Sequence, residues 1–115
     1  MALDKNLISG SGTMLILKLL DGQDMYGYQM IEELARRSNH TFEFKTGTLY
    51  PLLHGLEDKE LITSYEKEET TQRPRRYYHL TNKGKKMLRE KQEEWNTYTN
   101  AVNLVLQGGV SFATA

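Results

Sequence analysis

The chain has 115 residues, enough for one domain with a single hydrophobic core. It contains no cysteine, which excludes disulfides, thiolate zinc sites and a cysteine nucleophile. Its formal net charge is zero, but the charges are unevenly distributed: residues 1–72 carry 7 basic and 12 acidic residues, residues 73–91 carry 8 and 1, and residues 92–115 carry 0 and 2. The local +7 over residues 73–91 indicates a phosphate-binding surface, with a solvated helix face as the alternative.

Membrane insertion and catalysis are not expected. The apolar run of residues 14–20 is too short to span a bilayer and is interrupted by Lys18, so we expect a cytoplasmic protein with no membrane partner. The sequence shows no paired carboxylates and no Ser/His/Asp spacing with a chemical rationale. His40, His54 and His79 fall on an expected turn, helix and strand, which suits no metal geometry. We therefore expect no catalytic residue, metal site or cofactor.

The first predicted helix covers residues 4–20 and ends before Asp21-Gly22. It is apolar on more than one side, so one face is expected to join the core of its own chain and the other a second subunit. Gly10, Ser11 and Gly12 lie inside it. Either they permit the close approach of another helix, or the helix begins only near Ser11 or Thr13 and the residues before it form an arm.

A turn at residues 21–26 is followed by a helix predicted over Gly27–Ser38 and another over Thr46–Glu60. In the latter, Leu49, Leu52, Leu53 and Leu56 follow the i, i+3, i+4, i+7 spacing of one buried face. The opposite face is polar and uncharged near its start, so it can approach a polyanion without repulsion. This pair of helices has the outline of a helix-turn-helix. The N-cap of the second is either Thr48, with Pro51 in the first turn, or Thr46, with one internal hydrogen bond lost.

After Ile62 the apolar period changes from 3.6 to 2, which predicts strands at residues 61–66 and 75–80. A hairpin that follows a helix-turn-helix is a wing. The expected wing carries Arg73, Arg75 and Arg76, whose side chains can reach phosphates or a minor groove.

The last predicted helix starts at the N-cap Thr81, runs to about Gln107 and is ended by Gly108-Gly109. At about 26 residues it would be roughly 39 Å long, more than the core of so small a domain can cover. One seam repeats at alternating four- and three-residue spacings: Gly84, Leu88, Lys91, Trp95, Tyr98, Val102 and Val105. This seam implies a partner helix, most simply from a second copy of the chain.

The fold class expected is therefore mainly α with a small antiparallel β-hairpin: a winged helix-turn-helix plus one long C-terminal helix. The expected organisation is a DNA-binding domain with an N-terminal helix at 1–80, a dimerisation helix at 81–107 and a disordered tail at 108–115.

Three motifs carry a family resemblance. GTLYPLLHGLEDKELI, followed by QRPRRYYHLTNKG, resembles the PadR family of bacterial transcriptional regulators, and the upstream MYGYQMIEEL matches the family's second helix. The resemblance covers about residues 10 to 100, and the single last helix is similar to the smaller subfamily. It implies a winged helix-turn-helix homodimer that represses genes by binding palindromic double-stranded DNA operators. In some small members a flat aromatic ligand stacks between the subunits on an aromatic residue of the last helix.

Carried over residue by residue, the resemblance implies a DNA-binding set: Tyr28, Thr46, Thr48, Tyr50, His54, Arg73, Arg75 and Arg76. Of these, Thr48, Tyr50 and His54 are expected on the exposed side of the recognition helix. Trp95 falls where drug-binding members place their stacking residue, with Glu93 and Glu94 beside it to suit a cationic aromatic; the alternative is a plain dimer-core residue. The implied dimerisation set is Leu7, Ser11, Leu88, Trp95, Tyr98, Val102 and Val105. One departure from the family is Lys45-Thr46, where many members have Ser-Pro.

The function expected is a ligand-responsive, homodimeric repressor that binds a palindromic operator. The alternative is a winged-helix module that binds other proteins and no DNA. The local +7 favours DNA, because a protein-interaction module has no need of such a basic run.

Overall fold

The computed structural model describes residues 5–69 and 72–108. Its elements, in chain order, are α1 (Lys5–Leu19), β1 (Met25–Tyr26), α2 (Gly27–Arg37), α3 (Thr46–Asp58), β2 (Ile62–Glu69), β3 (Gln72–Leu80) and α4 (Asn82–Leu106). The described chain is mostly helical, with a three-stranded antiparallel sheet in the order β1-β3-β2, which confirms the winged-helix fold class. The tail expected at 108–115 lies, from residue 109 on, outside the described residues.

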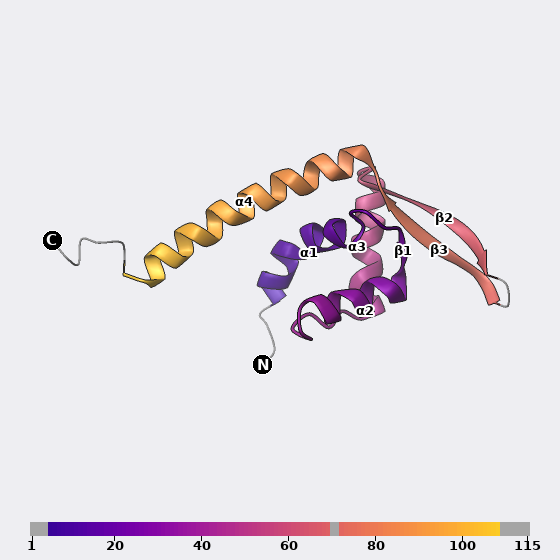
Figure 1. The fold of residues 1–115 in the computed structure, drawn as a ribbon, viewed down its shortest axis with the longest axis horizontal. Helices are drawn as coiled ribbons and strands as arrows, with labels where there is room; N and C mark the ends of the chain where they lie inside the picture. Colours follow the sequence, from indigo (N-terminus) through magenta and orange to yellow (C-terminus); the bar gives the residue numbers. More distant parts are fainter. Residues whose placement is uncertain (1–4, 70–71, 109–115) are drawn as a thin grey trace.

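The molecule consists of a compact head with two projections (Figure 1). The head contains α1, α2, α3 and the base of the sheet; the wing, which is the β2–β3 hairpin, and α4 extend from it on opposite sides. The radius of gyration is 17.3 Å, against about 13 Å for a compact chain of this length. None of the described helices is long and apolar enough to cross a membrane.

One hydrophobic core holds the head together. The predicted stripe of α3 is confirmed, with Leu49, Leu53 and Leu56 buried and Leu52 half-buried. Contributions from the other elements include Ile16, Leu17, Leu20, Met30, Ile62, Tyr78 and Leu80. Because α3 is covered on this face, only its opposite face is left to meet a partner.

The structure decides between the two interpretations of the first helix. α1 begins at Lys5, so the three small residues lie within it. A Cβ atom on Gly12 would lie 3.3 Å from the side chain of Leu52 on α3, closer than most such contacts. Gly12 therefore permits the close approach of α1 to α3, as one of the two alternatives expected.

The ends of α2 and the start of α3 differ slightly from the prediction. α2 ends at Arg37, and Asn39 and His40 adopt left-handed conformations with φ of 52° and 64°. The N-cap of α3 is Lys45, so both threonine alternatives were wrong. The backbone carbonyl of Lys45 accepts hydrogen bonds from the amides of Thr48 and Leu49, both at 2.9 Å. Pro51 consequently lies inside the helix, where it cannot donate the usual backbone hydrogen bond.

The sheet contains one strand more than predicted. β1, expected as part of a turn, pairs with β3 through Met25↔Tyr78 and Tyr26↔Tyr77. The strands of the wing are also longer than predicted, because β2 reaches Glu69 and β3 starts at Gln72. The pairing becomes irregular between Lys67 and Glu69, beside Pro74 of β3, which has no amide to donate.

The start of α4 is joined tightly to the short segment between α3 and β2. The Thr81 hydroxyl accepts a hydrogen bond from the Gly84 amide at 2.9 Å, which confirms the predicted N-cap. The same hydroxyl lies 2.8 Å and 3.0 Å from the carbonyl oxygens of Glu60 and Leu61, to which it can donate. A Cβ atom on Gly84 would lie only 2.1 Å from the Leu61 carbonyl oxygen, so no larger residue fits here. We call this contact the α3–α4 joint.

Candidate nucleic-acid interface

The exposed face of α3 lies at its N-terminal end. Thr48 and His54 are exposed, as predicted, and Thr46 is exposed beside them. Gly47 and Pro51 are also exposed and fall with His54 on the i, i+4, i+7 spacing of a single stripe. The sequence analysis did not include these two residues in the interface, although the helical period that predicted the leucines also predicts this stripe.

Tyr50 does not share that exposed face. Its ring is half-buried and packs against the core. A Cβ atom on Gly27 would lie 2.3 Å from the Tyr50 hydroxyl oxygen, so the ring rests directly on the start of α2. The placement of Tyr50 on the exposed side of the helix was therefore wrong, because its bulk fills the space where the two helices meet.

An open cavity joins α2, α3 and the wing. It has a volume of about 490 Å³ and is lined by Tyr26, Gly27, Tyr28, Tyr50, Arg75 and Arg76. Tyr28 is 63% exposed at the second position of α2. The cavity thus brings together four of the eight residues predicted to bind DNA.

Protein contacts hold two of the three wing arginines in place. The Arg75 guanidinium carbon lies 4.4 Å from the centre of the Tyr26 ring, a cation–π distance. Arg76 donates a hydrogen bond at 3.0 Å to the Ser64 hydroxyl, which in turn donates at 2.7 Å to the Glu57 carboxylate of α3. Arg73 lies further out on β3 and is exposed. Arg75 is therefore oriented by β1, and Arg76 by β2 and, through Ser64, by α3, before any ligand binds.

The basic run of residues 73–91 is divided between two elements. Its arginines at 73, 75 and 76 lie on β3, whereas Lys83, Lys85 and Lys86 are exposed on α4. In addition, β2 places Glu66 opposite Arg76. The charges of the run are thus shared between the wing and the start of α4, as the predicted strand and helix bounds imply, and the phosphate-binding surface stays a prediction.

Lys45 adds a cation that the sequence analysis noted only as a departure from the family. It is exposed and caps the N-terminus of α3. This end of a helix carries partial positive charge, so a lysine here is unfavourable for the isolated fold. Local features of this kind often mark functional surfaces.

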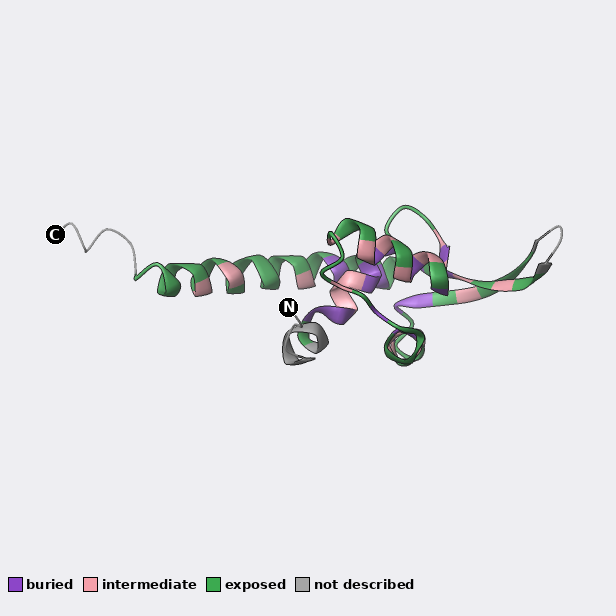
Figure 2. Ribbon diagram, turned by 90° about the horizontal axis from the view of Figure 1, so that it is seen from below, coloured by how far each residue is buried: buried purple, intermediate pink, exposed green. Residues whose placement is uncertain are grey.

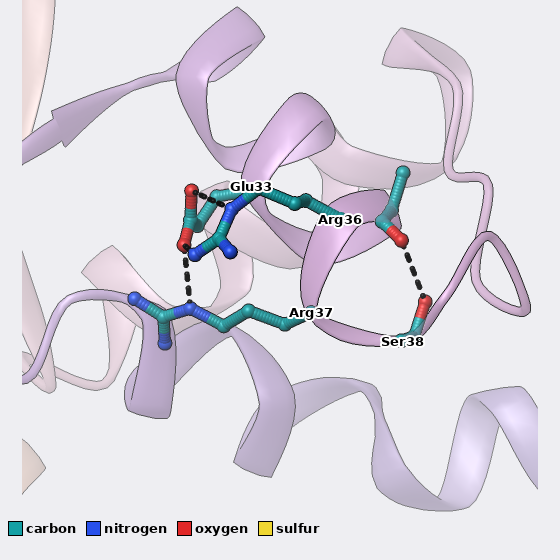
Figure 3. A network of polar contacts seen from close by, with 5 residues as sticks. Glu33, Arg36, Arg37 and Ser38 are labelled. Carbon is teal, nitrogen blue, oxygen red and sulfur yellow. Dashed lines mark hydrogen bonds and ion pairs between the residues drawn. The ribbon is translucent and has the colours of Figure 1, made fainter.

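A second pair of arginines, Arg36 and Arg37, forms ion pairs within α2. Arg36 and Arg37, at the end of α2, both form ion pairs with Glu33, the second with its Nε 2.8 Å from the carboxylate (Figure 3). The hydrogen bond from Arg36, followed by that from Arg37, lowers the pKa of Glu33 to about 2. These arginines lie at the opposite end of α2 from Tyr28, so we do not include them in the interface.

The residues predicted for dimerisation fall into two groups. Ser11 and Leu88 are buried inside their own chain, at 7% and 3% exposure, so they have little surface left for a partner. Trp95, Tyr98 and Val105 are exposed along α4, and Val102 is half-buried. The Trp95 and Tyr98 rings are 6.2 Å apart. The Leu7 side chain lies outside the described part of the structure.

These features define a class. A helix-turn-helix whose second helix has an exposed polar start, with an arginine-bearing hairpin beside it, is a winged-helix DNA-binding module. Within the described ranges, no group of three or more His, Cys, Asp or Glu residues is placed to hold a metal ion.

Comparisons with known proteins identify the family. Residues 16–90 match the transcriptional regulator PadR-like family. A protein of Lysinibacillus sphaericus, itself uncharacterised, is 34% identical over 103 residues, covering 90% of this chain and 94% of that protein. A transcriptional regulator from Clostridium thermocellum has a TM-score of 0.79 at 34% identity, covering 85% of this chain and 95% of that one. A PadR family regulator from Clostridium difficile has a TM-score of 0.73 at 36% identity, covering 84% and 98%.

The chain therefore belongs to the PadR-like family of transcriptional regulators. It is a DNA-binding regulator and not an enzyme.

Proposed function

We propose that the protein is a homodimeric repressor that binds a palindromic operator in the cytoplasm and is released by a planar aromatic ligand. The observation that carries the DNA-binding geometry is the open cavity in which Tyr28 at the start of α2 and Tyr50 of α3 lie with Arg75 and Arg76 of β3, together with the exposed polar start of α3.

In this proposal the N-terminal end of α3 enters the major groove. Thr46, Thr48 and His54 present side chains to base edges, and Gly47 lets the backbone approach because nothing lies within 4 Å of the position of its missing Cβ. Lys45 lies beside them and would contact a phosphate.

The wing and the start of α2 would hold the phosphate backbone on either side of this groove. Tyr28 supplies an exposed hydroxyl, and Arg73, Arg75 and Arg76 supply charge. Tyr50 contributes indirectly, because its ring sets the distance between α2 and α3.

A second copy of the chain is the proposed partner of α4. From Gln92 onward nearly every described residue of this helix is exposed, including Trp95, Tyr98 and Val105 (Figure 2). Apolar side chains on an isolated helix are unstable in water unless another surface covers them. Pairing of two α4 helices would place two α3 helices for successive major grooves, about 34 Å apart.

Trp95 is the proposed ligand contact within this seam. It is 41% exposed with Tyr98 close by. Glu93 and Glu94 flank it, and Glu94 lies 4.0 Å from the ammonium of Lys91, which leaves Glu93 as the source of net negative charge. A cationic planar aromatic could stack on the indole ring. Quenching of the fluorescence of Trp95, the single tryptophan, would report binding directly.

The test is a titration of the DNA immediately upstream of the protein's own coding region, with random DNA as competitor and at two salt concentrations. We expect tight, competitor-resistant binding at two protomers per site. A protein that contacts 6–10 phosphates should lose roughly 10³–10⁵ in affinity between 50 and 200 mM salt. Binding that random DNA removes equally well would place the operator elsewhere. No binding at low salt would contradict the proposal and favour a protein-interaction module.

A further inference from the structure

A single carboxylate connects the head to both strands of the wing. Asp24 precedes β1, and its Oδ1 lies 2.8 Å from Nδ1 of His79 on β3. Its Oδ2 accepts a hydrogen bond at 2.7 Å from the hydroxyl of Tyr65 on β2. These partners are 55 and 41 residues away along the chain. Burial raises the pKa of Asp24, but the hydrogen bonds with Tyr65 and His79 outweigh this effect and the pKa is lowered.

The rings beside this carboxylate extend the contact toward the wing arginines. The Tyr65 ring stacks on Tyr77 with centres 5.8 Å apart and planes at 16°. Tyr77 packs edge-on against Tyr26, with ring centres 5.4 Å apart. The guanidinium carbon of Arg75 lies 4.4 Å from the centre of the same Tyr26 ring. An unbroken series of contacts thus leads from Asp24 to Arg75.

The position of this contact matters because the wing is long and supported only near its base. β1 pairs with β3 at Tyr77 and Tyr78, and beyond these residues the hairpin extends away from the helices (Figure 1). Six residues separate His79 from Arg73, a span of about 20 Å in an extended strand. A rotation of about 10° at the base would move Arg73 by about 3.5 Å, more than a hydrogen bond tolerates.

We propose that Asp24 is a positioning residue for DNA binding, which fixes the direction of the wing by holding Tyr65 and His79 together. The inference rests on the proposed function and deepens it. It assigns a role to an acidic residue that would not touch DNA and that lies close to a surface for a polyanion.

Loss of the Asp24 carboxylate should change the DNA affinity in opposite directions, depending on whether Asp24 acts only through its charge or also by positioning the wing. If Asp24 had no positioning role, removing its negative charge would strengthen DNA binding, because less repulsion would remain. If Asp24 holds the wing, the Asp24→Ala variant should bind DNA more weakly despite its extra positive charge. Glu68→Gln is the matched control, since it removes one negative charge from an exposed position of the same hairpin.

The experiment measures the operator affinity of these variants over a range of salt concentrations. We expect Asp24→Ala to weaken binding roughly tenfold and to reduce the salt slope by about 1 to 2, because phosphate contacts of the wing are lost while every arginine remains. Glu68→Gln should leave affinity unchanged or raise it. Asp24→Asn, which keeps an oxygen acceptor for Tyr65, should lie between Asp24→Ala and the wild type.

Tyr65→Phe provides a milder change, because it removes only the hydroxyl and keeps the stacked ring. It should weaken binding in the same direction, and the double variant with Asp24→Ala should be no weaker than Asp24→Ala alone, since the two groups act through one contact. Thermal unfolding checks that each variant remains folded; if Asp24→Ala does not fold, Asp24→Asn and Tyr65→Phe decide the question.

A second readout needs no DNA. Hydrogen exchange at the β3 amides between Tyr77 and the tip of the wing should be faster in Asp24→Ala than in the wild type and in Glu68→Gln. DNA affinity equal to or higher than that of the wild type, or unchanged exchange in the wing, would overturn the inference. If the wild type itself bound no DNA, the proposed function would fail, and faster exchange would still support Asp24 as the residue that holds the wing.

Discussion

The wing arginines provide the most direct quantitative test of the interface. Replacing Arg75 and Arg76 by alanine removes two positive charges from each protomer, and four from a dimer. Each neutralised phosphate contributes about 0.9 to the slope of log affinity against log salt, so the slope should become shallower by up to about 3.6. When the salt concentration is raised fourfold, the DNA affinity of the wild type should therefore fall by a factor up to about 150 times larger than the factor for the variant.

That figure is an upper limit, because both side chains already have protein partners. Arg75 lies on the Tyr26 ring and Arg76 donates to Ser64. The assay is fluorescence anisotropy with operator and with unrelated duplex. Both affinities should fall alike, since phosphates carry no sequence information. Lys85→Ala/Lys86→Ala removes the same charge from exposed positions on α4 and should change the slope by much less. Equal slopes in the two double variants would refute the assignment of the wing.

Three further results are expected. Gly84→Ala should destabilise the protein by about 1–3 kcal/mol, measured by chemical denaturation, since the new Cβ would meet the Leu61 carbonyl oxygen. Gly55→Ala is the control: nothing lies within 4 Å of its Cβ position, so it should stabilise the protein by up to about 1 kcal/mol. Equal destabilisation by the two substitutions would contradict this reasoning. Folding lowers the pKa of Asp24, so its stabilising contribution is present above the unfolded pKa of about 3.9 and is lost as the pH falls below that value. The free energy of unfolding of Asp24→Asn should therefore depend less on pH between about pH 5 and 3 than that of the wild type. His54→Ala should reduce the preference for operator over random DNA with little change in the salt slope of binding. A changed slope with an unchanged preference would show that His54 contacts a phosphate and not a base.

Elements with a strong local period were predictable from the sequence. The leucine stripe of α3, the alternation of the wing strands and the Thr81 cap were all confirmed, because each depends on residues within one element. The exposed positions of α3 followed from the same helical period. Tyr50 was misplaced because a bulky side chain at the edge of a stripe turns toward whichever neighbour offers space, and here that neighbour is Gly27.

Features that depend on distant parts of the chain could not be predicted. β1 has two residues and no period of its own; it exists because β3 offers Tyr77 and Tyr78 as partners. The contact between Asp24 and the wing likewise joins a loop residue to residues of β2 and β3.

The α3–α4 joint connects the proposed ligand site to the proposed DNA site without a flexible linker. Only Thr81 separates β3 from α4, and its hydroxyl contacts the carbonyl oxygens at the end of the α3 segment. Trp95 lies eleven residues beyond Gly84, about 16 Å along the helix. Displacing α4 by about 2 Å at Trp95 would therefore rotate it by about 7° around the joint. Since Gly84 is packed directly on Leu61, a rotation of α4 would be transmitted to the short segment that follows α3. In the proposed dimer, two α3 helices displaced in opposite directions by such a rotation would no longer match successive major grooves.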